Sequence, residues 1–353
     1  MTSKIPFFSI IVPCCDVEPY VRECLISVIN QSFKDWECII GIETCKDRTE
    51  DIIHKIIDGD DRFKVFTGPR SGSCSASRNT GIDMAQGEYV IFLDGDDTIV
   101  DGSLQRLHDK IVERPGADIY PCAIQVYNEK SGKNEELRDN YPLSSPRELT
   151  GPEATIYTAS YGFPCPMLQM TVFLRDFLIV QNLRCLLGLR RQDSEFSPRA
   201  LYLAKRVIPL HEPFYIYRKA RQGSVSVAAH GEMNLLQDHA YLIKSLLSFH
   251  AKVSQQPDFD IRVSKCWGQQ WMRRIFYLWF APDNIKASSR AWRVKTLFII
   301  FAEGDGNFKK LAKATSFSRR IAGWCVCAYA HYPFLRGMVE MFFFFYFWIS
   351  KVK

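Results

Sequence analysis

Three aspartates stand together at the end of a short, wholly apolar segment of the chain. The segment is residues 89–93, and Asp94, Asp96 and Asp97 follow it with a single glycine between them. Carboxylates this close repel one another unless a cation offsets their charge, and a hard divalent cation takes oxygen ligands of this kind. An acidic turn without a ligand is the alternative, because Asp and Gly are common in turns.

A loop rich in serine and glycine forms the second candidate site. Residues 71–77 lead into a stretch, residues 76–85, whose pattern predicts a helix, and Arg78 lies in its first turn. Backbone N–H groups at a helix start and a nearby guanidinium are able to bind a phosphate group. A surface cation without a ligand is the alternative for Arg78.

The elements before these loops indicate how they are positioned. Apolar runs of strand length occur at residues 8–12, 36–40, 63–66 and 89–93, and segments with helical spacing of apolar residues separate them. Strands without polar alternation, joined by helices, predict a Rossmann-like α/β fold, with a mostly parallel sheet flanked by helices. Ligands of such sheets bind beyond the carboxyl ends of the strands, where the three aspartates stand. A further strand is predicted at residues 118–127.

The charge of the chain is divided unevenly, and this marks a second region. Residues 251–353 carry 17 Lys and Arg against 6 Asp and Glu, whereas residues 1–250 carry 28 against 33. We predict an α/β domain over residues 1–228, with a nucleotide-binding part over about 1–105 and a second part over about 106–228, and a helical appendage at 229–353. Its basic and aromatic composition favours an anionic membrane surface over nucleic acid as its partner. A helical core or a homodimer interface is the alternative.

The ordered motifs resemble one known family. Residues 9–13 (SIIVP), 77–82 (SRNTGI) and 92–97 (FLDGDD) follow one another as in the inverting family 2 glycosyltransferases of the GT-A fold, which build bacterial surface polysaccharides, and the similarity is dense over residues 7–105. The resemblance implies transfer of a sugar from a nucleoside-diphosphate sugar, with uridine diphosphate as the expected carrier. It also implies Mn²⁺ or Mg²⁺ as cofactor.

The resemblance assigns the donor side of the site residue by residue. Arg78 is expected to contact the diphosphate, Asp94 and Asp96 are expected to bind the donor, and Asp96 and Asp97 are expected to bind the metal. Four residues are expected to contact the nucleoside: Pro13, Cys15, Glu18 and Glu43. The family's usual Asp-Asp-Gly-Ser-Thr-Asp is replaced here by residues 42–47 (IETCKD). Glu43 keeps a carboxylate at this place, one methylene longer than Asp.

The acceptor side, over about residues 106–228, is assigned in the same way, with fewer matches. Asp193 corresponds to the catalytic base, which removes the proton of the acceptor hydroxyl as its oxygen attacks the anomeric carbon. The acidic pair of the family has become Gln192 and Asp193, and Arg218 and Ser224 are weaker acceptor-side candidates. A helix cap without a catalytic role is the alternative for Asp193. The acceptor is expected to be a hydroxyl of a glycan or of a lipid-linked saccharide.

Two other functions fit part of the same residues. Asp94-Gly95-Asp96-Asp97-Thr98 also matches the Asp-x-Asp-x-Thr motif of haloacid-dehalogenase-type phosphatases, but three strand and helix units precede it, where that motif normally ends the first strand. A non-catalytic scaffold of the GT-A fold is the other alternative, because the Glu43 loop and Gln192 are altered. The expected location is cytoplasmic, peripheral on the inner face of the cell membrane.

Overall fold

Strands that are buried on both faces form the centre of one of two compact units. The computed structural model describes residues 5–135, 137–139, 141, 148–160, 167–220 and 233–280, together with Val294, Leu297, Val326 and Val339. It divides into two compact units, residues 1–154 with 165–227 and residues 155–164 with 228–353.

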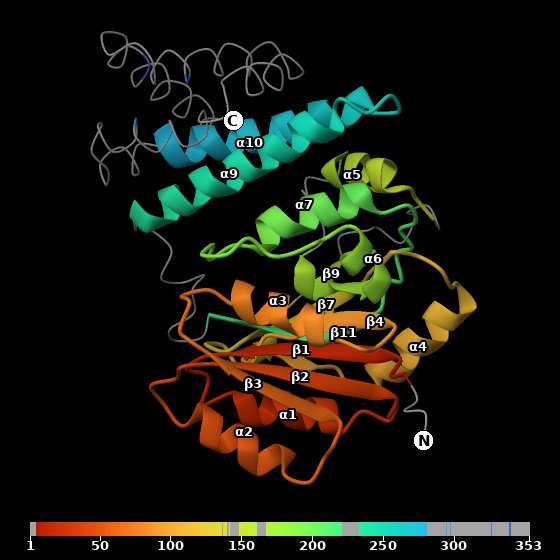
Figure 1. Cartoon of the computed structure of the whole chain (residues 1–353), viewed down its shortest axis with the longest axis vertical. Helices are drawn as coiled ribbons and strands as arrows, with labels where there is room; N and C mark the ends of the chain where they lie inside the picture. The colour runs from red at the N-terminus through yellow and green to blue at the C-terminus, as the bar shows by residue number, and fades with distance from the viewer. Residues whose placement is uncertain are drawn as a thin grey trace. The chain divides into compact units, whose positions relative to one another are not determined.

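A six-stranded sheet organises the first unit (Figure 1). Its order is β3-β2-β1-β4-β10-β6, and only β10 runs antiparallel to its neighbours. Every residue of β1, β2 and β4 is buried, as the unbroken apolar runs predicted, so the expected parallel sheet is confirmed. The strands are β1 (Phe8–Cys14), β2 (Trp36–Glu43), β3 (Phe63–Gly68), β4 (Tyr89–Phe92), β6 (Ile119–Pro121) and β10 (Thr171–Leu174).

Helices cover both faces of this sheet. Helices α1 (Val21–Ile29) and α2 (Thr49–Ile57) lie on one face, and α3 (Ser75–Met84) lies on the other, against β1 and β2 (Figure 1). Helices α1 and α2 bury apolar side chains, whereas α3 buries mainly small and polar residues. The remaining helices of the unit are α4 (Ser103–Glu113), the start of α5 (Gly151–Ser160), the 3₁₀ turn η1 (Leu168–Met170), α6 (Arg175–Val180) and α7 (Asp193–Leu203).

A smaller sheet lies beyond the carboxyl end of β4. Its order is β5-β11-β7-β8, and β9 also pairs with β7. The strands are β5 (Thr98–Ile99), β7 (Ala123–Asn128), β8 (Lys133–Asn134), β9 (Arg138–Asp139) and β11 (Pro213–Lys219).

The single strand predicted over residues 118–127 is wrong. Its two halves, β6 and β7, belong to different sheets, and the chain changes sheet at Cys122. Pro121 has no N–H for a ladder bond, the Cys122 N–H donates to the Met170 carbonyl at 2.7 Å, and the Ala123 N–H donates to the Glu212 carbonyl at 3.0 Å. Partners distant in sequence therefore decide this break.

The described part of the second unit is built on two long helices. Helices α9 (Met233–Val253) and α10 (Ile261–Phe280) pack together, and His250 Nε2 lies 2.8 Å from Ser264 Oγ. Trp267 and Trp271 are buried there with their rings stacked, their centroids 5.3 Å apart, so these two aromatic residues belong to a helical core. Among the helices that the structure describes, none is both long and apolar enough to cross a bilayer. Most of the predicted basic and aromatic tail lies outside the described residues.

Candidate active site

The three aspartates of the sequence motif form one cluster at the carboxyl end of β4. One carboxylate oxygen from each of Asp94, Asp96 and Asp97 lies within 4.8 Å of the others. Gly95 packs the loop against the end of β1, since a Cβ atom there would lie 2.9 Å from the Cys14 Sγ atom. The structure therefore brings together the three residues that the sequence predicted at a cation, and the glycine lets them turn tightly.

Asp97 is the buried member of the cluster, with 2% of its surface exposed. The Tyr215 hydroxyl donates to Asp97 Oδ2 at 2.5 Å, and the backbone N–H of Arg218 donates to Oδ1 at 2.7 Å. Burial raises the pKa of Asp97 well above its ordinary value, and the charges of Asp96 and Asp94 raise it further. A bound divalent cation would offset this repulsion, so the donor set fits such an ion.

Asp94 is held by two side chains from other parts of the unit. Arg78 Nη2 donates to Asp94 Oδ1, and Gln169 Nε2 donates to Oδ2 at 2.8 Å. The Asp94 N–H donates to the Tyr215 hydroxyl oxygen at 3.2 Å, so Tyr215 contacts two of the three aspartates. Sequence reasoning assigned no role to Tyr215 or Gln169, and the signal for Tyr215 is the segment Tyr215-Ile216-Tyr217-Arg218 of β11, which resembles the Tyr-x-Tyr-Arg strand of the family.

Arg78 lies inside the protein, whereas the sequence alone also allowed a position on the surface. Only 1% of its surface is exposed. Burial alone would lower the pKa of its guanidinium, but the Asp94 carboxylate raises it above the ordinary value. The guanidinium therefore stays charged and forms an ion pair with Asp94, whose own side chain is 25% exposed.

The same guanidinium reaches the start of α7. The Gln192 amide is oriented with its oxygen accepting from Arg78 Nη1, because the opposite orientation would point two donors at each other. In this orientation its nitrogen donates to the Arg190 and Leu189 carbonyls at 2.9 and 3.0 Å. Asp193, the predicted base, is the next residue and begins α7 in a partly exposed position. Arg78 thus joins the acidic cluster to the helix that carries Asp193.

The predicted nucleoside residues lie near the carboxyl ends of β1 and β2, with Cys15 and Glu18 on the loop after β1. Pro13 is near the end of β1, and Glu43 ends β2 and is buried. The Ser71 hydroxyl and N–H donate to the Glu43 carboxylate at 2.7 and 2.9 Å, which links β2 to the serine-rich loop. Glu18 pairs with Arg48 at 2.6 Å, and this partner lowers the pKa of Glu18.

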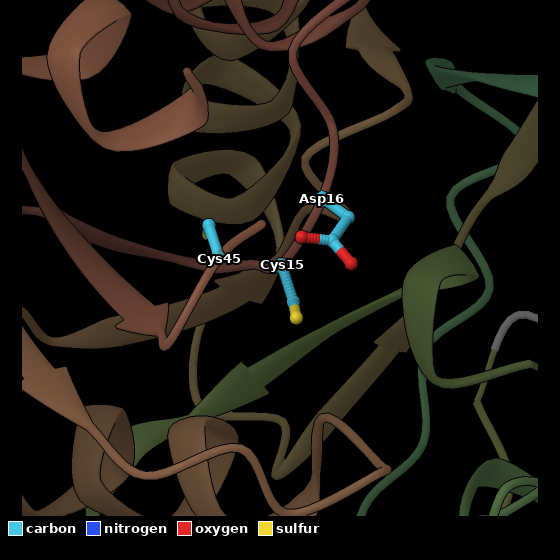
Figure 2. Close-up of side chains that lie close together, drawn as sticks. All are labelled: Cys15, Asp16 and Cys45. Carbon is cyan, nitrogen blue, oxygen red and sulfur yellow. The ribbon is translucent and has the colours of Figure 1, made fainter. Parts of the chain in front are cut away.

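A second set of three potential ligands occurs between the same loops. One ligand atom from each of Cys15, Asp16 and Cys45 lies within 4.8 Å of the others, and Figure 2 shows the three side chains at the meeting point of the loops. Asp16 accepts from the Lys46 N–H and from Arg70 Nη1, each at 2.6 Å. Burial raises the pKa of Cys15 to about 11 and raises that of Cys45. Protonated thiols beside an arginine make a poor cation site.

Arg218 lies beside the acidic cluster and contacts it through the backbone. Its Nε donates to the Asp96 carbonyl at 3.0 Å, and its Nη2 pairs with Glu23 at 2.6 Å. The guanidinium carbon lies 5.1 Å from the Tyr20 ring centroid and 5.3 Å from that of Tyr127. Ser224, the other weak acceptor-side candidate, lies outside the described residues.

A mostly parallel sheet with an acidic cluster beyond a central strand defines an α/β protein of the nucleotide-binding type. Residues 9–178 match the model of glycosyl transferase family 2, so this part of the chain is a domain of that family. The fold is also found in solved structures: the chain superposes on S. aureus TarS 1–349 in complex with UDP-GlcNAc with a TM-score of 0.70, over 92% of this chain and 88% of that one, at 19% identity. The fold is GT-A.

Two curated relatives are more similar to this chain in sequence than TarS is. The glycosyltransferase EpsJ of Bacillus subtilis (strain 168) is 33% identical over 227 residues, which cover 61% of this chain and 62% of EpsJ. The GalNAc(5)-diNAcBac-PP-undecaprenol beta-1,3-glucosyltransferase of Campylobacter jejuni is 28% identical over 231 residues, covering 64% of this chain and 69% of that protein. The chain thus spans less than two thirds of the length of EpsJ.

Proposed function

We propose that the protein is a metal-dependent inverting glycosyltransferase of polysaccharide biosynthesis. It moves a sugar from a nucleoside-diphosphate donor, with uridine diphosphate as the carrier, to a hydroxyl of a glycan or a lipid-linked saccharide. The observation that carries the proposal is the acidic cluster of Asp94, Asp96 and Asp97, connected through the buried Arg78 to the helix that begins at Asp193. One buried guanidinium thereby spans the donor and acceptor sides.

The donor side would bind a charged leaving group. Asp96 and Asp97 would hold Mn²⁺ or Mg²⁺, and the ion, when bound, supplies positive charge that stabilises the departing diphosphate. Pro13, Cys15, Glu18 and Glu43 would contact the nucleoside. Since Arg78 is buried and already contacts Asp94 and Gln192, its role in the proposal is to fix these two groups, and any contact with the diphosphate would be secondary.

The acceptor side would activate a hydroxyl group. The Asp193 carboxylate accepts the proton of the acceptor hydroxyl while its oxygen attacks the anomeric carbon. The bond from that carbon to the diphosphate oxygen breaks on the opposite face, so the configuration at the carbon inverts. Gln192 cannot serve as a second acid or base, which leaves Asp193 as the proposed base of the pair.

The acceptor and the location are supported by one relative and by composition. The printed name of the Campylobacter jejuni relative states that it acts on a saccharide joined by diphosphate to undecaprenol, and we propose an acceptor of this lipid-linked class. Residues 251–353 have an excess of 11 positive charges, which supports peripheral attachment to an anionic inner membrane face. A homodimer interface or a helical core remains the alternative use of that region.

A panel of nucleoside diphosphates with and without Mn²⁺ tests the donor proposal. We expect the thermal midpoint to rise with uridine diphosphate only when Mn²⁺ is present. The substitution Asp96→Asn should lower transfer or donor hydrolysis by at least about 100-fold, because the ion supplies several kcal/mol in such sites.

The control for this experiment is Asp176→Asn, an exposed carboxylate outside the site that should retain activity. Stabilisation by nucleotide without turnover on a broad acceptor panel would favour the non-catalytic scaffold. Stabilisation by inorganic phosphate mimics alone would favour the phosphatase alternative, in which Asp94 is the nucleophile.

A further inference from the structure

Two leucines on the loop before α7 face solvent. Leu186 is 37% exposed and Leu187 is 66% exposed. Gly188 follows with φ +77°, and a Cβ atom built there would meet no other atom within 4 Å. The chain therefore turns sharply in open space, with both leucines at the turn. Single exposed leucines are ordinary on protein surfaces, but an adjacent pair at a turn is less so.

The backbone that presents these leucines is fixed. The Cys185 N–H donates to Asn79 Oδ1 at 2.8 Å, and Asn79 Nδ2 donates to the Cys185 carbonyl at 2.9 Å. The Ser75 hydroxyl donates to the Leu186 carbonyl at 2.9 Å. These bonds attach the loop to α3, whereas the leucine side chains remain outside. Their exposure is thus imposed by an ordered scaffold.

The charged residues of the loop itself are arginines, of which Arg184 pairs with Asp83 of α3 at 2.5 Å. Residues 184–191 contain three arginines and no acidic residue, and Arg190 and Arg191 are partly exposed directly after the turn. Apolar side chains next to arginines match the boundary of a bilayer, where acyl chains meet phosphate groups. The arginines would repel a basic or cationic partner, and two exposed leucines are unfavourable in a loop that contacts only water.

The loop also leads directly into the proposed base. Gln192 and Asp193 follow Arg191 without a gap, and the Gln192 amide nitrogen donates to the carbonyls of Leu189 and Arg190. A surface that contacts the leucines would therefore lie near the place where an acceptor hydroxyl meets Asp193.

We propose that residues 185–191 form a membrane-docking loop. Leu186 and Leu187 enter the acyl boundary of an anionic phospholipid bilayer, and Arg190 and Arg191 contact its phosphate headgroups. The purpose of this docking, which is to bring Asp193 to acceptors held in the membrane, rests on the proposed function, whereas the docking itself does not. It is separate from the attachment proposed for the basic tail.

Hydrogen exchange of the full chain gives a local test. With vesicles of phosphatidylglycerol, the peptide spanning residues 183–191 should exchange more slowly than without them. In the double variant L186S/L187S this protection should disappear, and vesicle affinity measured by flotation should fall at least about tenfold, as expected for losing one to two buried leucines. The control Val112→Ser removes a valine that is 56% exposed on α4, and it should bind as the wild type does.

The charge part is tested with R190Q/R191Q, in which the protection of residues 183–191 should no longer be greater with phosphatidylglycerol than with phosphatidylcholine vesicles. Unchanged exchange of residues 183–191 on adding vesicles would overturn the docking loop, even if the tail attaches the chain to them. Protection that rises with protein concentration in the absence of vesicles would overturn it too, and would assign the loop to contact with a second copy.

The test also separates this inference from the proposed function. L186S/L187S should keep the Mn²⁺-dependent stabilisation by uridine diphosphate, because the leucine side chains lie outside the acidic cluster. If the wild type shows vesicle protection of the loop but neither stabilisation nor turnover, the proposed function fails and the docking loop stands.

Discussion

Two clusters of potential metal ligands lie at the edge of one sheet, and their surroundings differ. The acidic cluster combines three carboxylates, and burial and mutual repulsion raise the pKa of Asp97. The thiol cluster of Cys15, Asp16 and Cys45 has Arg70 on its carboxylate and thiols whose pKa values are raised by burial. Ligand spacing alone does not separate the two. The balance of charge does, because each cluster has an arginine on one carboxylate, but only the acidic cluster has two further carboxylates, Asp96 and Asp97, for a cation to bind.

The largest effect on stability is expected when Arg78, the buried cation that pairs with Asp94 in the acidic cluster, is replaced. Arg78→Gln removes the partner of Asp94 and should lower the free energy of unfolding by about 3 kcal/mol or more, as for other ion pairs that lose a buried member. Urea denaturation measures the change. The exposed Arg48→Gln, which also breaks an ion pair, should unfold near the wild-type midpoint. Equal losses in both variants would mean that Arg78 is not a special support of the cluster.

Tyr215→Phe tests the hydroxyl that contacts two aspartates. The variant removes a hydrogen bond to the buried Asp97 carboxylate and should cost about 1.5–3 kcal/mol of unfolding free energy. Tyr217→Phe, two residues along the same strand, serves as the matched control and should change stability by about 0.5 kcal/mol or less. Thermal or urea unfolding of the two variants decides the point, and similar small changes would argue against Tyr215 as the support of Asp97.

The raised pKa of Asp97 predicts how cation binding depends on pH. The folded protein holds this proton more tightly than the unfolded chain, so the contribution of Asp97 to stability is present at low pH and is lost as pH rises through the raised value. A bound cation displaces the proton, so Mn²⁺ affinity should rise about tenfold per pH unit at pH values below the raised pKa of Asp97. Calorimetry at several pH values measures it. A pH-independent affinity would contradict the assignment of Asp97 as a ligand.

The smallest expected effect concerns the thiol cluster. Cys15→Ser should leave the stoichiometry of Zn²⁺ and Mn²⁺ binding unchanged and should alter the free energy of unfolding by about 0.5 kcal/mol or less. Equilibrium dialysis with metal analysis provides the measurement. A Zn²⁺ ion bound by the wild type and absent from the variant would reverse the ranking of the two clusters.

The sequence predicted those parts of the site that depend on local pattern. Apolar runs identified β1 to β4, and the position of the aspartates after the fourth run placed them at the sheet edge where the structure has them. The residues that fix the cluster come from far along the chain. Tyr215 is 118 residues from Asp97, and Gln169 is 75 residues from Asp94. No periodicity encodes such pairings, because they depend on strand register between two sheets.

The same limit explains the errors and omissions elsewhere. The change of sheet at Cys122 depends on bonds to Met170 and Glu212, which lie in distant segments. The burial of Arg78 depends on Asp94 and Gln192 closing around it, although its place in a helix was predicted. The catalytic role of Asp193 and the nucleoside contacts stay predictions, since they rest on the family resemblance.

The packing at Gly95 has a consequence for sequence variation. A side chain at position 95 would meet the Cys14 sulfur at 2.9 Å and the Pro13 carbonyl at 3.2 Å, so the aspartate loop and the end of β1 can change size only together. A homologue with alanine at position 95 should carry a smaller residue than cysteine at position 14. In a deep mutational library, substitutions at the two positions should be tolerated only together, so that each single variant is depleted and the compensated double variant is retained.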